Sequence, residues 1–194
     1  MIENGDYTIE LSISDLNKPD NRASFISYPV SVNFKPEEIS ISSIQLIKEF
    51  YKTEEENPLS KSGYDIVPYV DNFYGPSNNK LIYYAEIYNP LTTQGSSERY
   101  LISNYIESFE SRQLLNNYVM VKRENATPVR VILNEFDISD LPSGNYNLVV
   151  SLRDKNNVIV AHQVTFFQRL NELVKPAGLE VAEPKLPKIV LQRK

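Results

Sequence analysis

The chain has 194 residues, a formal net charge of −5 and a sequence pI near 5.1, so it can bury a sizeable core but lacks the basic surface that nucleic-acid binding requires. Hydrophobic residues make up 41% and charged residues 23% of the sequence, which is ordinary for a globular protein. The absence of cysteine and the single histidine, His162, exclude disulfides, thiolate nucleophiles and metal sites built on two histidines.

The first predicted element belongs to an internal repeat. Residues 5–17, Gly5-Asp-Tyr-Thr-Ile-Glu-Leu-Ser-Ile-Ser-Asp-Leu-Asn17, align without a gap with residues 144–156, at an offset of 144 − 5 = 139. Apolar residues alternate in both copies, which predicts a strand with one buried face. Each copy then reaches an Asp and Asn turn, and a second β-rich run follows at 25–34 and at 158–167. Each copy is therefore predicted to form a hairpin.

Further strands are predicted between the two copies, separated by segments rich in Gly, Pro, Asn and Ser. Residues 108–116 are an alternative position for a short helical turn. No segment has the 10 to 15 residue apolar pattern of a longer helix, so we predict an all-β protein of antiparallel sheets packed as a sandwich. The predicted strands cover 40–49, 64–70, 79–89, 99–109, 117–123 and 128–138.

The sequence predicts two units and a tail. Residues 1–50 are expected to form a partial sandwich, 51–63 a linker loop, 64–172 a complete sandwich, and 173–194 a Pro- and Lys-rich tail or linker. The linker contains three consecutive glutamates, which are costly to bury. A hairpin alone is only marginally stable. We therefore expect that the chain is a fragment of a longer protein, or that its first hairpin takes its pairing from elsewhere.

Five motifs occur in a fixed order along the chain. They are Ile41-Ser-Ser-Ile-Gln-Leu46, Ser62-Gly-Tyr-Asp-Ile-Val-Pro68, Leu81-Ile-Tyr-Tyr-Ala-Glu-Ile-Tyr-Asn89, Leu141-Pro-Ser-Gly-Asn-Tyr146 and Phe166-Phe-Gln-Arg-Leu-Asn171. Together they resemble the β-rich region that precedes the C-terminal domain of GWxTD-domain proteins from Bacteroidota, and the resemblance covers about residues 5–171. The chain has no tryptophan and hence no Gly-Trp-x-Thr-Asp motif, so the role of that domain is not transferred.

The resemblance implies Ig-like or macroglobulin-like sandwiches in an exported protein of the cell envelope. It places the protein in the periplasm or at the cell surface, although the N-terminus has no signal-peptide pattern. The implied partners are envelope proteins or flanking domains of the same protein. No transmembrane segment is expected, because no apolar run reaches about 18 residues.

No group of residues forms a recognisable catalytic or metal-binding motif. His162 lies within a predicted strand and no nucleophile-elbow sequence accompanies it. Glu86 is the most notable carboxylate for a two-carboxylate hydrolase, but a structural carboxylate, hydrogen-bonded to a neighbouring strand or to Arg99, is the favoured interpretation. The acidic runs 137–140 and 54–56 do not match a calcium-binding loop. We predict no catalytic residue, cofactor or metal.

Tyrosines concentrate between residues 64 and 88, and they carry the predicted binding site. A tyrosine is apolar in its ring and polar at its hydroxyl, so it suits a core seam, a protein interface or a sugar platform. The candidate partner-binding residues are Tyr74, Tyr84, Glu86 and Tyr88. The sequence thus predicts a non-catalytic structural or interaction module. Alternatives are a carbohydrate-binding module with surface tyrosines and a carboxylate-pair hydrolase.

Overall fold

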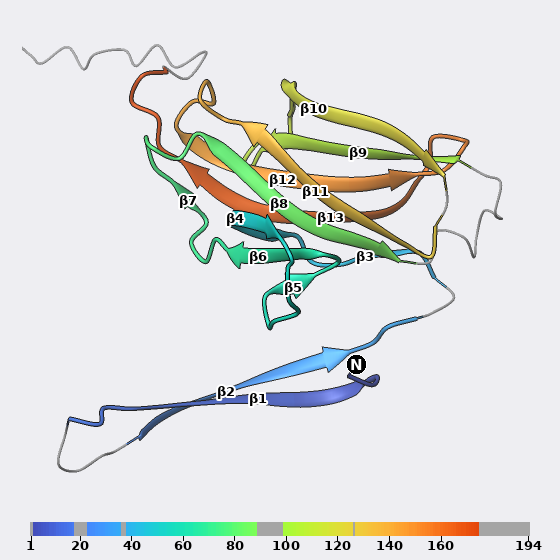
Figure 1. Cartoon of the computed structure of the whole chain (residues 1–194). Helices are drawn as coiled ribbons and strands as arrows, with labels where there is room; N and C mark the ends of the chain where they lie inside the picture. Colours follow the sequence, from blue (N-terminus) through green and yellow to red (C-terminus); the bar gives the residue numbers. More distant parts are fainter. Residues whose placement is uncertain (1, 18–22, 36–37, 89–98, 126, 175–194) are drawn as a thin grey trace, which may run out of the picture. The chain divides into compact units, whose positions relative to one another are not determined.

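A computed structural model describes residues 2–17, 23–35, 38–88, 99–125 and 127–174 (Figure 1). The chain divides into two compact units, Met1–Glu38 and Ile39–Lys194. The described residues contain strands and turns and no helix, so the predicted all-β fold of antiparallel sheets is confirmed. None of the described residues forms a helix that is long and apolar enough to cross a membrane.

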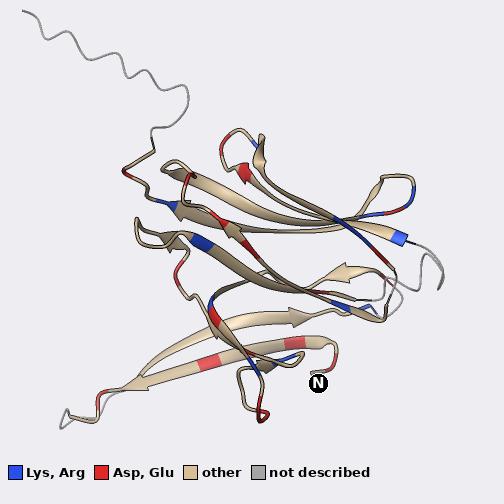
Figure 2. Ribbon diagram, turned by 45° about the horizontal axis from the view of Figure 1, so that its top comes forward, with Lys and Arg blue, Asp and Glu red and all other residues tan. Residues whose placement is uncertain are grey.

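The first unit is a two-stranded antiparallel hairpin. It consists of β1 (Gly5–Ser14) and β2 (Ala23–Val32), paired without a bulge from Gly5 opposite Val32 to Ser14 opposite Ala23. Both strands alternate in side-chain direction, so each face of the hairpin collects every second residue. Of the two strands, only β1 contains charged residues, Asp6 and Glu10, which Figure 2 shows as two red segments.

The described residues of the second unit form eleven strands in two sheets that face one another across a shared core (Figure 1). Their bounds are β3 (Ser40–Ile41), β4 (Gln45–Lys52), β5 (Ser60–Lys61), β6 (Tyr64–Pro68), β7 (Phe73–Tyr74), β8 (Lys80–Tyr88), β9 (Arg99–Ser108), β10 (Leu114–Asn125), β11 (Val129–Asp137), β12 (Gly144–Arg153) and β13 (Ile159–Arg169). The strand orders are β10-β9-β12-β13-β7 and β11-β8-β4-β6-β5, with β3 paired to β8. All pairs are antiparallel except the short pair of β13 with β7.

The core of the second unit lies between these two sheets. One sheet contributes alternate residues of β8, and the other contributes alternate residues of β9 and β12. This alternation is typical of a sandwich, because the side chains of the two inner faces interdigitate to form the core. The contributing residues are Leu81, Tyr83, Ala85, Ile87, Ile102, Ile106, Tyr146, Leu148, Val150 and Leu152.

A buried arginine fixes the end of β13. The Arg169 guanidinium is nearly covered and donates to the carbonyl oxygens of Gly75 at 2.6 Å and Asn78 at 2.8 Å. It also donates to Asn79 Oδ1 at 3.0 Å. A buried charge needs such partners, so Arg169 ties β13 to the loop that precedes β8.

Several strands have bounds that differ from the predicted ones. The strand expected at 40–49 is divided into β3 and β4, and the one at 64–70 ends at Pro68. The short helical turn considered for 108–116 is limited to one hydrogen-bonded turn at residues 109–111, between β9 and β10, and does not continue as a helix. There the Arg112 amide donates to Ser108 O at 3.0 Å, and Arg112 has a φ of 56°. β10 therefore begins at Leu114, before the predicted start at 117.

The division between the units differs from the predicted one. It falls after Glu38 rather than in the loop 51–63, so residues 39–50 do not belong to the first unit. The physical reason is strand pairing, since β4 is hydrogen-bonded to both β6 and β8. The glutamate-rich loop is a connection within the second unit. The predicted tail at 173–194 lies outside the described residues from 175 onward.

Candidate functional site

Three of the four predicted binding residues form one cluster on β8. Tyr84, Glu86 and Tyr88 occupy alternate positions, so their side chains lie on the same face, opposite the face that carries Tyr83 into the core. The hydroxyls of Tyr84 and Tyr88 each donate to the Glu86 carboxylate, to Oε1 and Oε2 respectively. The cluster therefore holds a carboxylate between two phenols.

The turn between β5 and β6 covers this cluster. Ser62 Oγ donates to Glu86 Oε1 at 3.2 Å. Lys61 Nζ lies 5.7 Å from the centroid of the Tyr84 ring and donates to Gln45 Oε1 at 2.9 Å. Tyr84 is 3% exposed, so the turn leaves little of its ring for a partner.

The cluster keeps Glu86 ionised. Burial, the largest single influence, raises its pKa, but hydrogen bonds from Tyr84, Tyr88 and Ser62 together with the charge of Lys61 outweigh burial, and the pKa is lowered. Burial and then the bond to Glu86 raise the pKa of Tyr84 to about 12, and the same two causes raise the pKa of Tyr88. A general acid needs a raised carboxyl pKa, so this arrangement suits structure better than proton donation.

Tyr74 does not join the cluster. It is 1% exposed, and its ring stacks on Tyr69 at 4.8 Å between centroids and meets Phe167 edge-on at 5.7 Å. A partner cannot reach a ring in that position. The prediction that Tyr74 contacts a partner is therefore at odds with its burial, because the strand pattern did not reveal which face of β7 is covered.

The other residues that the sequence analysis considered for catalysis or metal binding do not come together in a site. His162 is exposed on β13, opposite the buried Ser151 of β12. Asp137 Oδ1 accepts a hydrogen bond from the Ser139 amide at 2.9 Å, which is a local turn contact. Within the described part of the chain, no group of three or more His, Cys, Asp or Glu residues is placed to hold a metal ion.

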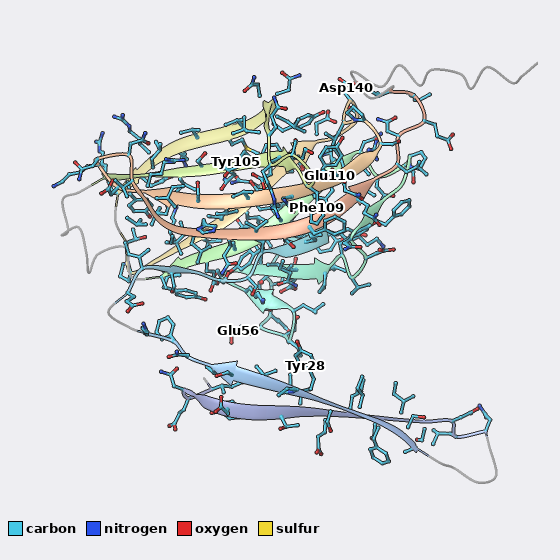
Figure 3. The ribbon with its side chains drawn as sticks, turned by 180° about the vertical axis from the view of Figure 1, so that it is seen from behind. Tyr28, Glu56, Tyr105, Phe109, Glu110 and Asp140 are labelled. Atoms are coloured by element: carbon cyan, nitrogen blue, oxygen red, sulfur yellow. The ribbon has the colours of Figure 1, made fainter. Side chains whose placement is uncertain are left out.

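Two surface hollows also occur in the second unit. One, of about 350 Å³, is lined in part by Arg99, Arg123 and Lys155, with Asp154 beside them; the three cations are exposed. The other, of about 780 Å³, is lined in part by Glu110 and Asp140, which Figure 3 labels. Neither hollow contains the Glu86 cluster.

The strongest candidate lies in the first unit. On one face of the hairpin every residue except Ser24 is apolar, and most of these side chains are 41% to 68% exposed. The opposite face carries Asp6 and Glu10. Figure 3 shows the side chains of the hairpin, with Tyr28 labelled. The exposed residues of the apolar face are Tyr7, Ile9, Leu11, Ile13, Ile26 and Tyr28.

The repeat shows that this exposure is unusual. The residues of β12 that correspond to Tyr7, Ile9, Leu11 and Ile13 are all at most 8% exposed. They are Tyr146, Leu148, Val150 and Leu152. Sequence reasoning identified the repeated hairpin but did not include it among the binding residues, because alternation predicts a buried face without saying what covers it.

Comparisons with known proteins identify no family for the chain. No family model matches it, and no curated protein matches it. Among solved structures, a beta-glucosidase from Kluyveromyces marxianus in complex with glucose has a TM-score of 0.29 at 11% identity, covering 69% of this chain and 14% of that one. The extracellular domain of a one-component system from B. thetaiotaomicron has a TM-score of 0.31 at 14% identity, covering 82% of this chain and 20% of that one. The chain thus spans a fifth or less of either protein.

Proposed function

We propose that this protein is a non-catalytic interaction module that docks to another protein through the apolar face of the hairpin β1–β2. The observation that carries this proposal is the exposure of Ile9, Leu11 and Ile13, in a hairpin whose copy buries the same positions. An exposed, contiguous apolar face of this kind marks an interaction site.

The energetics favour docking. Covering a Leu or Ile side chain contributes about 1.5–3 kcal/mol relative to leaving it in water. The face contains several such residues, so their sum can exceed the loss of translational and rotational freedom on association, which is at least about 4 kcal/mol. Docking also stabilises the hairpin itself, since two strands without a covered face are only marginally stable.

The two alternative functions have less support. A carbohydrate platform at the predicted tyrosines needs exposed rings, whereas two of them, Tyr74 and Tyr84, are buried. A hydrolase with two carboxylates needs an acid with a raised pKa, whereas the pKa of Glu86 is lowered. The location in the cell envelope stays a prediction from the family resemblance.

Site-specific photo-crosslinking tests the proposal. A photoreactive phenylalanine derivative replaces Leu11 on the apolar face in the full chain, and a matched variant carries it at Glu10 on the opposite face. We expect an irradiation-dependent protein adduct from position 11 in an extract of the source cells, and at least about tenfold less from position 10. Absence of the adduct at position 11, or equal adducts at both positions, would contradict docking through this face.

A further inference from the structure

The hairpin β1–β2 repeats the local structure of β12–β13 as well as its sequence. The Tyr7 hydroxyl donates to Glu3 O at 2.8 Å, and the Tyr146 hydroxyl donates to Pro142 O at 3.0 Å. Both bonds link a tyrosine to the carbonyl four residues earlier, across the glycine that opens the strand. Such a tyrosine corner occurs where a strand enters a sandwich.

The open ends of the two hairpins are closed in the same way. In the first, Asn4 and Phe34 exchange two hydrogen bonds, each of 2.7 Å. In the second, Ser143 Oγ donates to Asn171 O at 3.0 Å and accepts from the Asn171 amide at 2.8 Å. Asn4 and Ser143 are at the repeat offset, so the equivalence extends beyond the strands.

The starts of the two turns agree too. The Asn17 amide donates to Asp15 Oδ1 at 3.0 Å, and the Asn156 amide donates to Asp154 Oδ1 at 2.9 Å. Because the tyrosine, the open end and the start of the turn all match, β1 is equivalent to β12 and β2 to β13. The surroundings of β12 therefore indicate what β1 is built to meet.

β12 is an inner strand of its sheet. It pairs with β13 on one edge and, antiparallel, with β9 on the other, where Leu148 faces Ile106 and Leu152 faces Ile102. The described residues of β1 pair with β2 alone. β2 contains Pro29, which lacks an amide proton and is typical of an edge strand, whereas β1 contains no proline. The edge of β1 is therefore the one suited to another strand.

We propose that the second edge of β1 accepts an antiparallel strand in the register that β9 adopts on β12, donated by a polypeptide other than residues 39–174. The repeat offset places an apolar residue of the donated strand opposite Ile9 and another opposite Ile13. The same partner covers the apolar face with a second sheet, as β8 covers β12. This inference rests on the proposed docking function and specifies the geometry of docking.

A second copy of this chain fits the geometry less well. Two copies that pair through their β1 edges form one four-stranded sheet and leave both apolar faces uncovered. Two copies that pack face to face cover those faces but leave both β1 edges without a neighbour. A different polypeptide that supplies an edge strand and a facing sheet both pairs with the β1 edge and covers the apolar face.

Hydrogen exchange in the full chain tests the pairing. The probe is a synthetic peptide with the sequence of β9, residues 99–108, and the control peptide carries Asp at the positions of Ile102 and Ile106. We expect the probe to slow exchange at least about tenfold at the alternate β1 amides that do not bond to β2. The control peptide should leave those amides unchanged, and neither peptide should affect the amides of β12.

The outcomes separate this inference from the proposed function. If the alternate β1 amides are not slowed by the probe, edge pairing is wrong, whether or not the photo-adduct at position 11 forms. The adduct alone decides docking through the face. If sedimentation shows that the chain self-associates and those amides are already slow without peptide, the occupant is a second copy and the inference is also overturned.

Discussion

Two hairpins with the same tyrosine corner and the same Asp-to-Asn bond after the first strand have very different surroundings in this protein. In β12–β13 the apolar face is covered by β8, and the edge of β12 is paired with β9. In β1–β2 the corresponding face is exposed, and within the described residues β1 has a single neighbour. The difference shows that alternation alone makes a hairpin with one apolar face, while burial depends on other strands.

Truncating equivalent core positions should give the largest contrast. Leu148→Ala removes a fully buried side chain and should lower the free energy of unfolding of the second unit by about 2–5 kcal/mol. Ile9→Ala shortens an exposed side chain and should change the free energy of unfolding by less than about 0.5 kcal/mol. Urea unfolding of the isolated full chain followed by circular dichroism measures both. Equal losses would mean that Ile9 is buried in the isolated chain.

Removing the two equivalent tyrosine hydroxyls should give a smaller contrast. Tyr146→Phe breaks the bond to Pro142 O at a buried position and should cost about 1 kcal/mol. Tyr7→Phe breaks the bond to Glu3 O at an exposed position, where water replaces it, and should cost no more than a few tenths of a kcal/mol. The same unfolding assay applies, and a larger loss for Tyr7→Phe would reverse the assignment of exposed and covered hairpins.

The smallest expected difference between the two units is in how their stability depends on pH. Because the folded-state pKa of Glu86 is lowered, its stabilisation is present above the unfolded pKa and is lost as pH falls through the folded pKa. Glu86→Gln should therefore cost about 0.5 kcal/mol at neutral pH, after allowance for partial exposure, and this cost should shrink as the pH falls through the folded pKa of Glu86. Glu10→Gln on the exposed strand β1, which lies outside the cluster, is the control substitution. A Glu86→Gln cost that is unchanged at low pH would contradict the role of the carboxylate charge.

Local sequence patterns determined much of the fold. Alternation between Tyr7 and Ile13, and again between Tyr146 and Leu152, predicted strands with one apolar face. The turns at Asp15 and Asp154 could be predicted because each aspartate side chain accepts a hydrogen bond from the backbone amide two residues further on. These features depend on residues close together in the chain, so a single sequence contains enough information to find them.

Tertiary structure alone decided the rest. Residues 45–52 join the second unit because β4 pairs with β8, which lies more than thirty positions further along the chain. Tyr74 and Tyr84 are covered by Phe167 and by the turn at Ser62 respectively. The equivalent apolar faces of β1 and β12 differ in what covers them. Such contacts join residues distant in sequence, and no local periodicity specifies which distant strand will arrive at a given face.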